Sequence, residues 1–149
     1  MEDILVEIYS TVFAKRLAAV ETIVGQGRDP EWTLRAVICE VIVGAAAIAK
    51  QSAVLAQESS RMDQERWSSL QDNWRRYQET VRDVIRRGQA DGVFSTLASP
   101  EVASWAIFGV SSSLHTWFRP DGPKTANDIA TEVTDLVLSG LQPREGAKK

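Results

Sequence analysis

The side chains that most often carry out chemistry are sparse in this sequence. His115 is the only histidine and Cys39 the only cysteine among 149 residues. A nucleophilic triad needs a base that a carboxylate orients beside a nucleophile, and no acidic residue is near His115 in the sequence. Metal sites usually need several histidines, cysteines or paired carboxylates at helical spacing, and no such set is found. We therefore predict no enzymatic activity, no metal and no cofactor. His115 is expected to be a hydrogen-bonded interior or interface residue, or else to contact a ligand.

Charge and composition narrow the possible partners. The chain has 17 basic and 20 acidic residues, for a net charge of −3, and no segment has the basic surplus that releases counterions from DNA. We expect no nucleic-acid binding by this chain alone. Cys39 lies in an apolar helical pattern and cannot form an intrachain disulfide, which agrees with a reducing cytoplasm. The longest apolar run, residues 41–49, is far shorter than the roughly 20 residues that span a bilayer. A cytoplasmic protein without membrane contact is expected.

Apolar residues recur with the helical period, and no stretch alternates long enough to predict a strand. The pattern predicts five helices, at about residues 2–24, 30–57, 59–88, 100–118 and 126–141. Three of them begin with a capping residue, which is Asp29, Ser99 or Thr125. We predict an all-α bundle of five to six helices. It would form one domain over residues 1–141, with a flexible tail over 142–149.

The third predicted helix has an aromatic stripe. Large apolar side chains recur there at spacings of 3, 4, 3, 4 and 3, as Trp67, Leu70, Trp74, Tyr77, Val81 and Val84. One interpretation is core packing, and the other is that flat, polar-edged rings line a ligand cavity. The second predicted helix is apolar on all sides around residues 41–49, so other helices must enclose it. Its small residues allow either close helix packing or space for a ligand.

The last two predicted helices indicate a dimer. No formally charged residue occurs from Val102 to Phe118, so this helix needs burial on more than one side. We expect the two helices to form an antiparallel pair, joined by a turn at residues 120–123, and to build a symmetric four-helix bundle with a second copy. Such an interface would bury about 1,500 Å² or more. The expected interface residues are Ala106, Gly109, Val110, Ser113, Trp117, Ile129, Val133, Leu136, Val137 and Gly140.

Two stretches resemble the TetR family of transcriptional regulators. Residues 87–94 (RGQADGVF) are similar to the junction where that family's pocket-forming helices meet its dimerisation helices. Residues 114–122 (LHTWFRPDG), with the helix that ends at 136–141 (LVLSGL), resemble the link between the two dimerisation helices. The turn at 117–122 looks most like the branch that senses fatty-acyl or steroid-derived coenzyme A thioesters. Residues 2–5 are similar to the start of the helix that connects the DNA-binding head to the body.

The resemblance, over about residues 2–141, implies the family's C-terminal ligand-binding and dimerisation domain. It would form a homodimer and bind a small hydrophobic ligand, in that branch an acyl-CoA thioester, which controls DNA binding by a helix-turn-helix head. That head is not in this sequence. Either the sequence is part of a longer regulator, or the chain naturally lacks the head and binds a ligand or pairs with an intact relative. The alternative function is an interaction module with no ligand of its own.

The resemblance also implies a pocket among the first three helices and the inner face of the fourth. Aromatic rings there would hold an acyl chain or ring, and Ser112 or His115 could hydrogen-bond a carbonyl group. The expected lining residues are Trp67, Trp74, Tyr77, Trp105, Phe108, Ser112 and His115. The last four share one helix face at spacings of 3, 4 and 3. Four arginines could meet coenzyme A phosphates at the mouth, or simply form a solvated helix face: Arg61, Arg66, Arg75 and Arg76.

Overall fold

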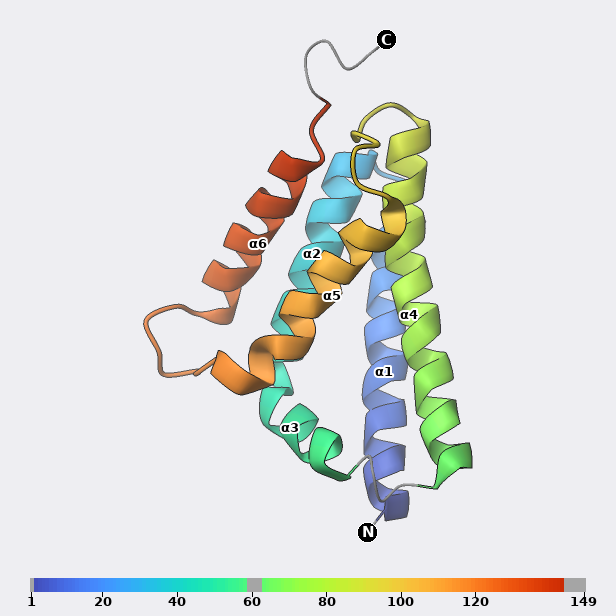
Figure 1. Cartoon of the computed structure of the whole chain (residues 1–149), viewed down its shortest axis with the longest axis vertical. Helices are drawn as coiled ribbons and strands as arrows, with labels where there is room; N and C mark the ends of the chain where they lie inside the picture. Colours follow the sequence, from blue (N-terminus) through green and yellow to red (C-terminus); the bar gives the residue numbers. More distant parts are fainter. Residues whose placement is uncertain (1, 59–62, 144–149) are drawn as a thin grey trace.

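The computed structural model describes residues 2–58 and 63–143, and these residues form helices and no strand. The helices are α1 (Glu2–Gly25), α2 (Pro30–Ala47), α3 (Ala49–Glu58), α4 (Gln64–Ala90), α5 (Pro100–Trp117) and α6 (Ala126–Gly140). The two long helices α1 and α4 lie side by side, and α5 and α6 lie beside α2 (Figure 1). The predicted all-α class is confirmed. None of the described helices is long and apolar enough to cross a membrane.

The predicted helix starts are confirmed by their caps. The Asp29 carboxylate accepts a hydrogen bond from the backbone N–H of Trp32 at 2.9 Å. The Ser99 hydroxyl accepts one from Val102 at 3.2 Å. Thr125 forms a reciprocal capping box with Asp128 at the start of α6. Each cap satisfies an amide that has no partner within its own helix.

The single helix predicted over residues 30–57 is wrong, because the chain bends at Ile48. This residue has φ −116° and ψ 20°, and its N–H donates to the Ala45 carbonyl at 3.2 Å. Beyond the bend, α3 leaves the axis of α2 and packs against α5 (Figure 1). Alanine favours helix, so the local sequence around Ile48 does not signal a break. The bend follows from this tertiary contact. The predicted start of the next helix, at residues 59 and 60, and residues 144–149 of the predicted tail lie outside the described residues.

The core is centred on α2, which α1, α4, α5 and α6 surround. Leu34, Ile38 and Ile42 on α2 are fully buried, which confirms that this apolar helix is enclosed on several sides. Ile129 on α6 also belongs to this core and is only 7% exposed. Its side chain is thus largely covered within one chain, which leaves it little surface for the predicted dimer contact.

The helices α5 and α6 run in opposite directions and are joined by a loop over residues 118–125, as predicted (Figure 1). The two helices contact each other little, and α6 packs chiefly against α2 (Figure 1). Arg35 on α2 forms an ion pair with Asp135 on α6, with 3.1 Å between Nη1 and Oδ1. The apolar surface of α2 lies beneath both helices, so each packs on α2 rather than on the other.

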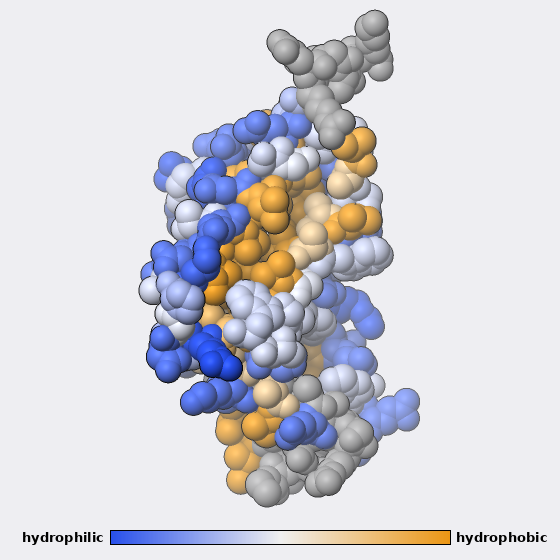
Figure 2. Space-filling view, turned by 60° about the vertical axis from the view of Figure 1, so that its left-hand side comes forward, coloured by the Kyte–Doolittle hydropathy of each residue, from blue (hydrophilic) through white to orange (hydrophobic). Residues whose placement is uncertain are grey.

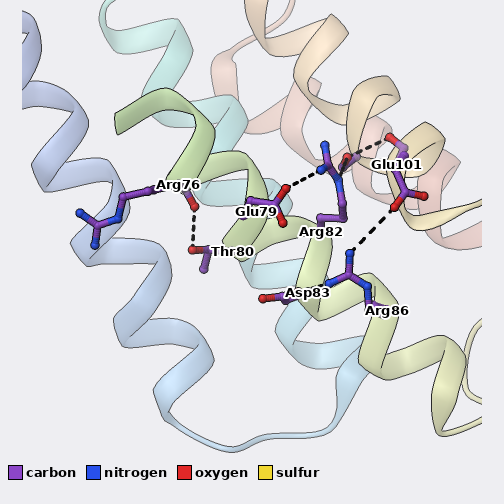
Figure 3. Close-up of polar contacts among 8 residues, drawn as sticks. Arg76, Glu79, Thr80, Arg82, Asp83, Arg86 and Glu101 are labelled. Atoms are coloured by element: carbon purple, nitrogen blue, oxygen red, sulfur yellow. Dashed lines mark hydrogen bonds and ion pairs between the residues drawn. The ribbon is translucent and has the colours of Figure 1, made fainter. Parts of the chain in front are cut away.

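Polar contacts hold the start of α5 against α4 (Figure 3). The Arg82 Nε atom donates to the Ser104 hydroxyl at 3.3 Å, and Arg82 also pairs with Glu79 on its own helix at 2.6 Å. One turn further along α4, Arg86 lies 3.9 Å from a carboxylate oxygen of Glu101. Ser104 is fully buried and Arg82 largely buried, so the contact between them fixes how α5 lies on α4.

Candidate ligand-binding cavity

A cavity of about 380 Å³ lies between α1, the bend at Ile48, α4 and α5. Its volume falls in the range of about 300–1,000 Å³ that is usual for small-molecule sites. The lining residues are Phe13 from α1, Ala45, Ile48 and Ala49 around the bend, Trp67, Leu70, Gln71 and Trp74 from α4, and Ser111, Ser112 and His115 from α5.

One wall of this cavity is a packed aromatic cluster centred on Trp74. The Trp74 ring stacks on Tyr77, with centroids 5.8 Å apart and 11° between the ring planes. It meets the edge of Phe108 at 5.2 Å and the tilted ring of Phe13 at 5.8 Å. Tyr77 and Phe108 are buried. Rings packed in stacked and edge-to-face pairs support one another, so the orientation of Trp74 is set before any ligand arrives.

The small residues of the α2–α3 region serve both purposes that the sequence left open. Ala45 and Ala49 line the cavity, where their short side chains leave space. Gly44 allows close approach instead, because a Cβ atom there would lie 1.9 Å from Nη1 of Arg16. Neighbouring small residues thus border the cavity and make room for the Arg16 side chain.

The polar groups of the cavity come mainly from α5. The Nδ1 atom of His115 lies 2.6 Å from the backbone carbonyl of Ser112. A carbonyl oxygen only accepts hydrogen bonds, so this contact requires a proton on Nδ1. Ser111, Ser112 and Gln71 add groups that can donate or accept. The site is therefore mostly apolar, with a few neutral hydrogen-bonding groups.

A smaller hollow of about 30 Å³ adjoins this cavity behind Trp74. The two share Phe13, Ala45, Ile48, Trp74 and Ser111, and the hollow adds Arg16, Val41 and Tyr77. Arg16 pairs there with Glu40, at 3.1 Å between Nη1 and Oε1. Burial raises the pKa of the Tyr77 hydroxyl, the Arg16 charge lowers it in part and Glu40 raises it. The hydroxyl thus stays protonated at neutral pH.

The predicted lining residues are partly brought together. Trp67, Trp74, Ser112 and His115 line the cavity, and Tyr77 lines the smaller hollow. Phe108 is buried behind Trp74 and reaches neither space.

Trp105 is placed on the other side of α5, with its side chain 58% exposed, and does not line the cavity. The inner face of this part of α5 is formed by buried Ala103, Ser104 and Ile107, so position 105 points away from the pocket.

Two of the four predicted arginine contacts, Arg75 and Arg76, lie outside the site. Arg75 and Arg76 are on α4 and line neither space, and Arg75 lies 3.7 Å from Asp72. Arg61 lies outside the described residues, as does the side chain of Arg66. The sequence did not lead us to expect Phe13 at the cavity or Arg16 at the smaller hollow. They face one side of α1 at a spacing of three residues, and an arginine within an apolar stripe was the available signal.

A second candidate surface is the outer face of α5 and α6. Leu136 is 73% exposed and Trp117 48%. Hydrophobic side chains gather in a band down the side of the molecule that carries α6 (Figure 2). Of the predicted interface residues, Ala106, Gly109, Trp117, Leu136 and Gly140 are exposed, while Val110, Ser113, Val133 and Val137 are half-buried. Val102 and Trp105 extend the same surface.

The fold and the site define an all-helical domain with a pocket beside a long first helix. Residues 27–141 match the family model described as the tetracyclin repressor-like C-terminal domain. The chain therefore belongs to the TetR family of transcriptional regulators and contains its C-terminal regulatory domain, a ligand-binding and dimerisation fold. The family resemblance seen in the sequence is confirmed. No curated protein sequence matches the chain.

Solved structures of TetR-family regulators share this fold. PfmR from Thermus thermophilus is 27% identical, with a TM-score of 0.84 over 95% of this chain and 77% of that one. The ketosteroid transcriptional regulator KstR2 of Mycobacterium tuberculosis is 21% identical, with a TM-score of 0.84 over 96% and 74%. AibR, solved in complex with isovaleryl coenzyme A and operator DNA, is 18% identical, with a TM-score of 0.73 over 91% and 73%.

Proposed function

We propose that this chain is the effector-binding and dimerisation domain of a TetR-type regulator and that a small, mainly apolar ligand in its cavity controls DNA binding. The observation that carries this proposal is the cavity of about 380 Å³, with its preset Trp74 wall, inside the family's regulatory domain. The proposed role of the chain is regulatory rather than catalytic, and it would act in the cytoplasm. We favour an acyl-CoA thioester as ligand, which the isovaleryl coenzyme A complex of AibR supports.

Dimerisation would use the outer face of α5 and α6. A helix with no charged side chain from Val102 to Trp117 and an exposed Leu136 on the next helix form an apolar surface that a second copy can cover. A two-fold interface would place each such surface against its equivalent. The residues that line the cavity, on α1, around Ile48, on α4 and on the C-terminal half of α5, are not among the predicted interface residues. A ligand could therefore bind without dissociating the dimer.

The route from ligand to DNA would run through α1. Phe13 brings α1 directly to the cavity wall and contacts Trp74. A ligand that fits best with one position of α1 would favour that position and the matching spacing of two DNA-binding heads. This requires different affinities for the two arrangements, because a ligand shifts an equilibrium only by its differential affinity.

Native mass spectrometry of the purified chain tests both parts of the proposal. We expect a dimer of about twice 16.5 kDa, with either a co-purified ligand or added decanoyl-CoA bound to each chain. The Ala45→Leu variant fills the cavity and is the matched control, because it should stay dimeric but lose the ligand mass. A dimer that takes up no ligand would favour the alternative, a dimerisation module without an effector. A monomer would contradict the proposed interface.

A further inference from the structure

Arg16 lies on the otherwise apolar inward face of α1, with Phe13, Leu17 and Val20. Its neighbours Leu17 and Val20 are buried, and its own side chain is only 24% exposed. The guanidinium group rests against Gly44, where any Cβ atom would lie 1.9 Å from Nη1. Its Nη1 atom donates to Glu40 Oε1 at 3.1 Å. The absence of a side chain at position 44 thus leaves room for the guanidinium group beside the small hollow.

This guanidinium has hydrogen-bonding capacity to spare. Arginine has five N–H donors, and among the described residues only Glu40 accepts from Arg16, through Nη1. Arg16 lines the small hollow together with Tyr77 and Ser111. The raised pKa of Tyr77 keeps its hydroxyl able to donate as well. Apolar Phe13, Val41 and Ile48 form most of the remaining wall. A group that enters here meets several donors in apolar surroundings.

The charges beside the small hollow determine which ligand groups can accept hydrogen bonds there. Glu40 already balances Arg16, so the pair has no net charge. A ligand carboxylate would bring a second negative charge next to the partly buried Glu40, which is unfavourable. A ketone, ester or hydroxyl oxygen accepts hydrogen bonds without adding charge.

We propose that the hollow lined by Arg16, Tyr77 and Ser111 is a subsite for an uncharged oxygen at the buried end of an apolar ligand, and that Glu40 excludes carboxylates from it. This proposal rests on the proposed function, since it specifies the ligand class of the same cavity. Among the seven lining residues expected from the sequence, none came from α1 or α2. The subsite adds Arg16 from α1 and Glu40 from α2.

Two probes of equal chain length test the subsite: nonan-2-one and nonanoate. Their affinities for the full chain can be measured by calorimetry at neutral pH. We expect nonan-2-one to bind more tightly than nonanoate. The Glu40→Gln variant should raise nonanoate affinity about tenfold, because it leaves Arg16 with an unbalanced positive charge. The same variant should leave nonan-2-one affinity within about twofold.

The paired variant Arg16→Met with Glu40→Met removes both charges together and avoids a buried unpaired carboxylate. It should weaken nonan-2-one about tenfold and remove the preference over nonanoate. One outcome separates the subsite from the cavity. If both probes bind the native chain and Ala45→Leu abolishes binding, but neither Glu40→Gln nor the Arg16→Met/Glu40→Met double variant changes their affinities, then the cavity is correct and the subsite is wrong. If neither probe binds but decanoyl-CoA does, the subsite is wrong and the cavity proposal stands, whereas failure of all three to bind contradicts both. Stronger binding of nonanoate to the native chain overturns the subsite alone.

Discussion

The ring of Phe94 packs directly on the backbone of Gly88, in the last turns of α4. A Cβ atom at position 88 would lie 2.1 Å from Cδ2 of Phe94. The Phe94 ring is buried, and the backbone N–H of Phe94 donates to the Gly88 carbonyl at 3.1 Å. The chain after α4 therefore folds back and closes this end of the core with an aromatic ring. Both residues belong to the stretch 87–94 that resembles the TetR family.

The Gly88→Ala substitution tests this contact. The added methyl group overlaps a buried ring that has little room to move, so we expect the free energy of unfolding to fall by about 1–3 kcal/mol. Urea denaturation measures it. Gly25→Ala is the matched control, because nothing lies within 4 Å of a Cβ there and its φ is not positive. That variant should be neutral or slightly more stable. Equal effects of the two substitutions would contradict the close packing.

The capping box of α6 predicts a pH dependence of stability. Hydrogen bonds from Thr125, first from its backbone and then from its side chain, hold the pKa of Asp128 below the ordinary value for an aspartate. A carboxyl group with a lowered pKa in the folded state stabilises the fold above its unfolded pKa. That contribution disappears as the pH falls through the folded pKa.

The Asp128→Asn variant should therefore be less stable than the native chain at pH 7, and the difference should shrink on acidification below the ordinary aspartate range. Urea unfolding at a series of pH values measures this, with Asp121→Asn in the preceding loop as control. A deficit that stays constant through strong acidification would mean that the charge of Asp128 contributes nothing.

Local signals in the sequence were enough to predict most helix ends. Asp29, Ser99 and Thr125 cap their helices through bonds that span only three residues, so the sequence contains all the partners. The bend at Ile48 could not be predicted in this way. It depends on α3 packing against α5, which is a contact between residues far apart in the chain.

The cavity was predictable on α4 and only partly on α5. Helical spacing places Trp67 and Trp74 on one face, and the fold turns that face inward. The same reasoning put Trp105 with Ser112 and His115, but it could not show that α5 covers the cavity only with its C-terminal half. Arg16 was missed because its role depends on Gly44 and Glu40, which belong to a different helix.

Substitution of Leu136 tests whether the outer face of α6 forms the dimer interface. Its side chain is 73% exposed on α6, so Leu136→Glu should not disturb the fold of one chain. In a two-fold interface it would bury two like charges, and we expect the dimer dissociation constant to rise at least about a hundredfold. Light scattering after size-exclusion chromatography measures this. Val54→Glu, at an exposed apolar position on α3, is the control and should stay dimeric. Loss of the dimer in both variants, or in neither, would contradict an interface on α6.

Trp74 and Trp105 should have opposite roles. Trp74→Ala removes the ring that lines the cavity and contacts Phe13, Tyr77 and Phe108. We expect nonan-2-one affinity to fall at least about tenfold and stability by about 2 kcal/mol, while the dimer persists. Trp105→Ala removes an exposed ring outside the cavity, so it should weaken the dimer and leave probe affinity unchanged.

Calorimetry and light scattering on both variants separate the two functions. A tryptophan that changes only ligand affinity belongs to the pocket, and one that changes only the dimer belongs to the interface, because the two surfaces lie on different sides of α5. If Trp74→Ala dissociated the dimer, Trp74 would be a core residue on which α5 depends. The aromatic stripe of α4 would then be packing, and the ligand would have to contact mainly Ser111, Ser112 and His115.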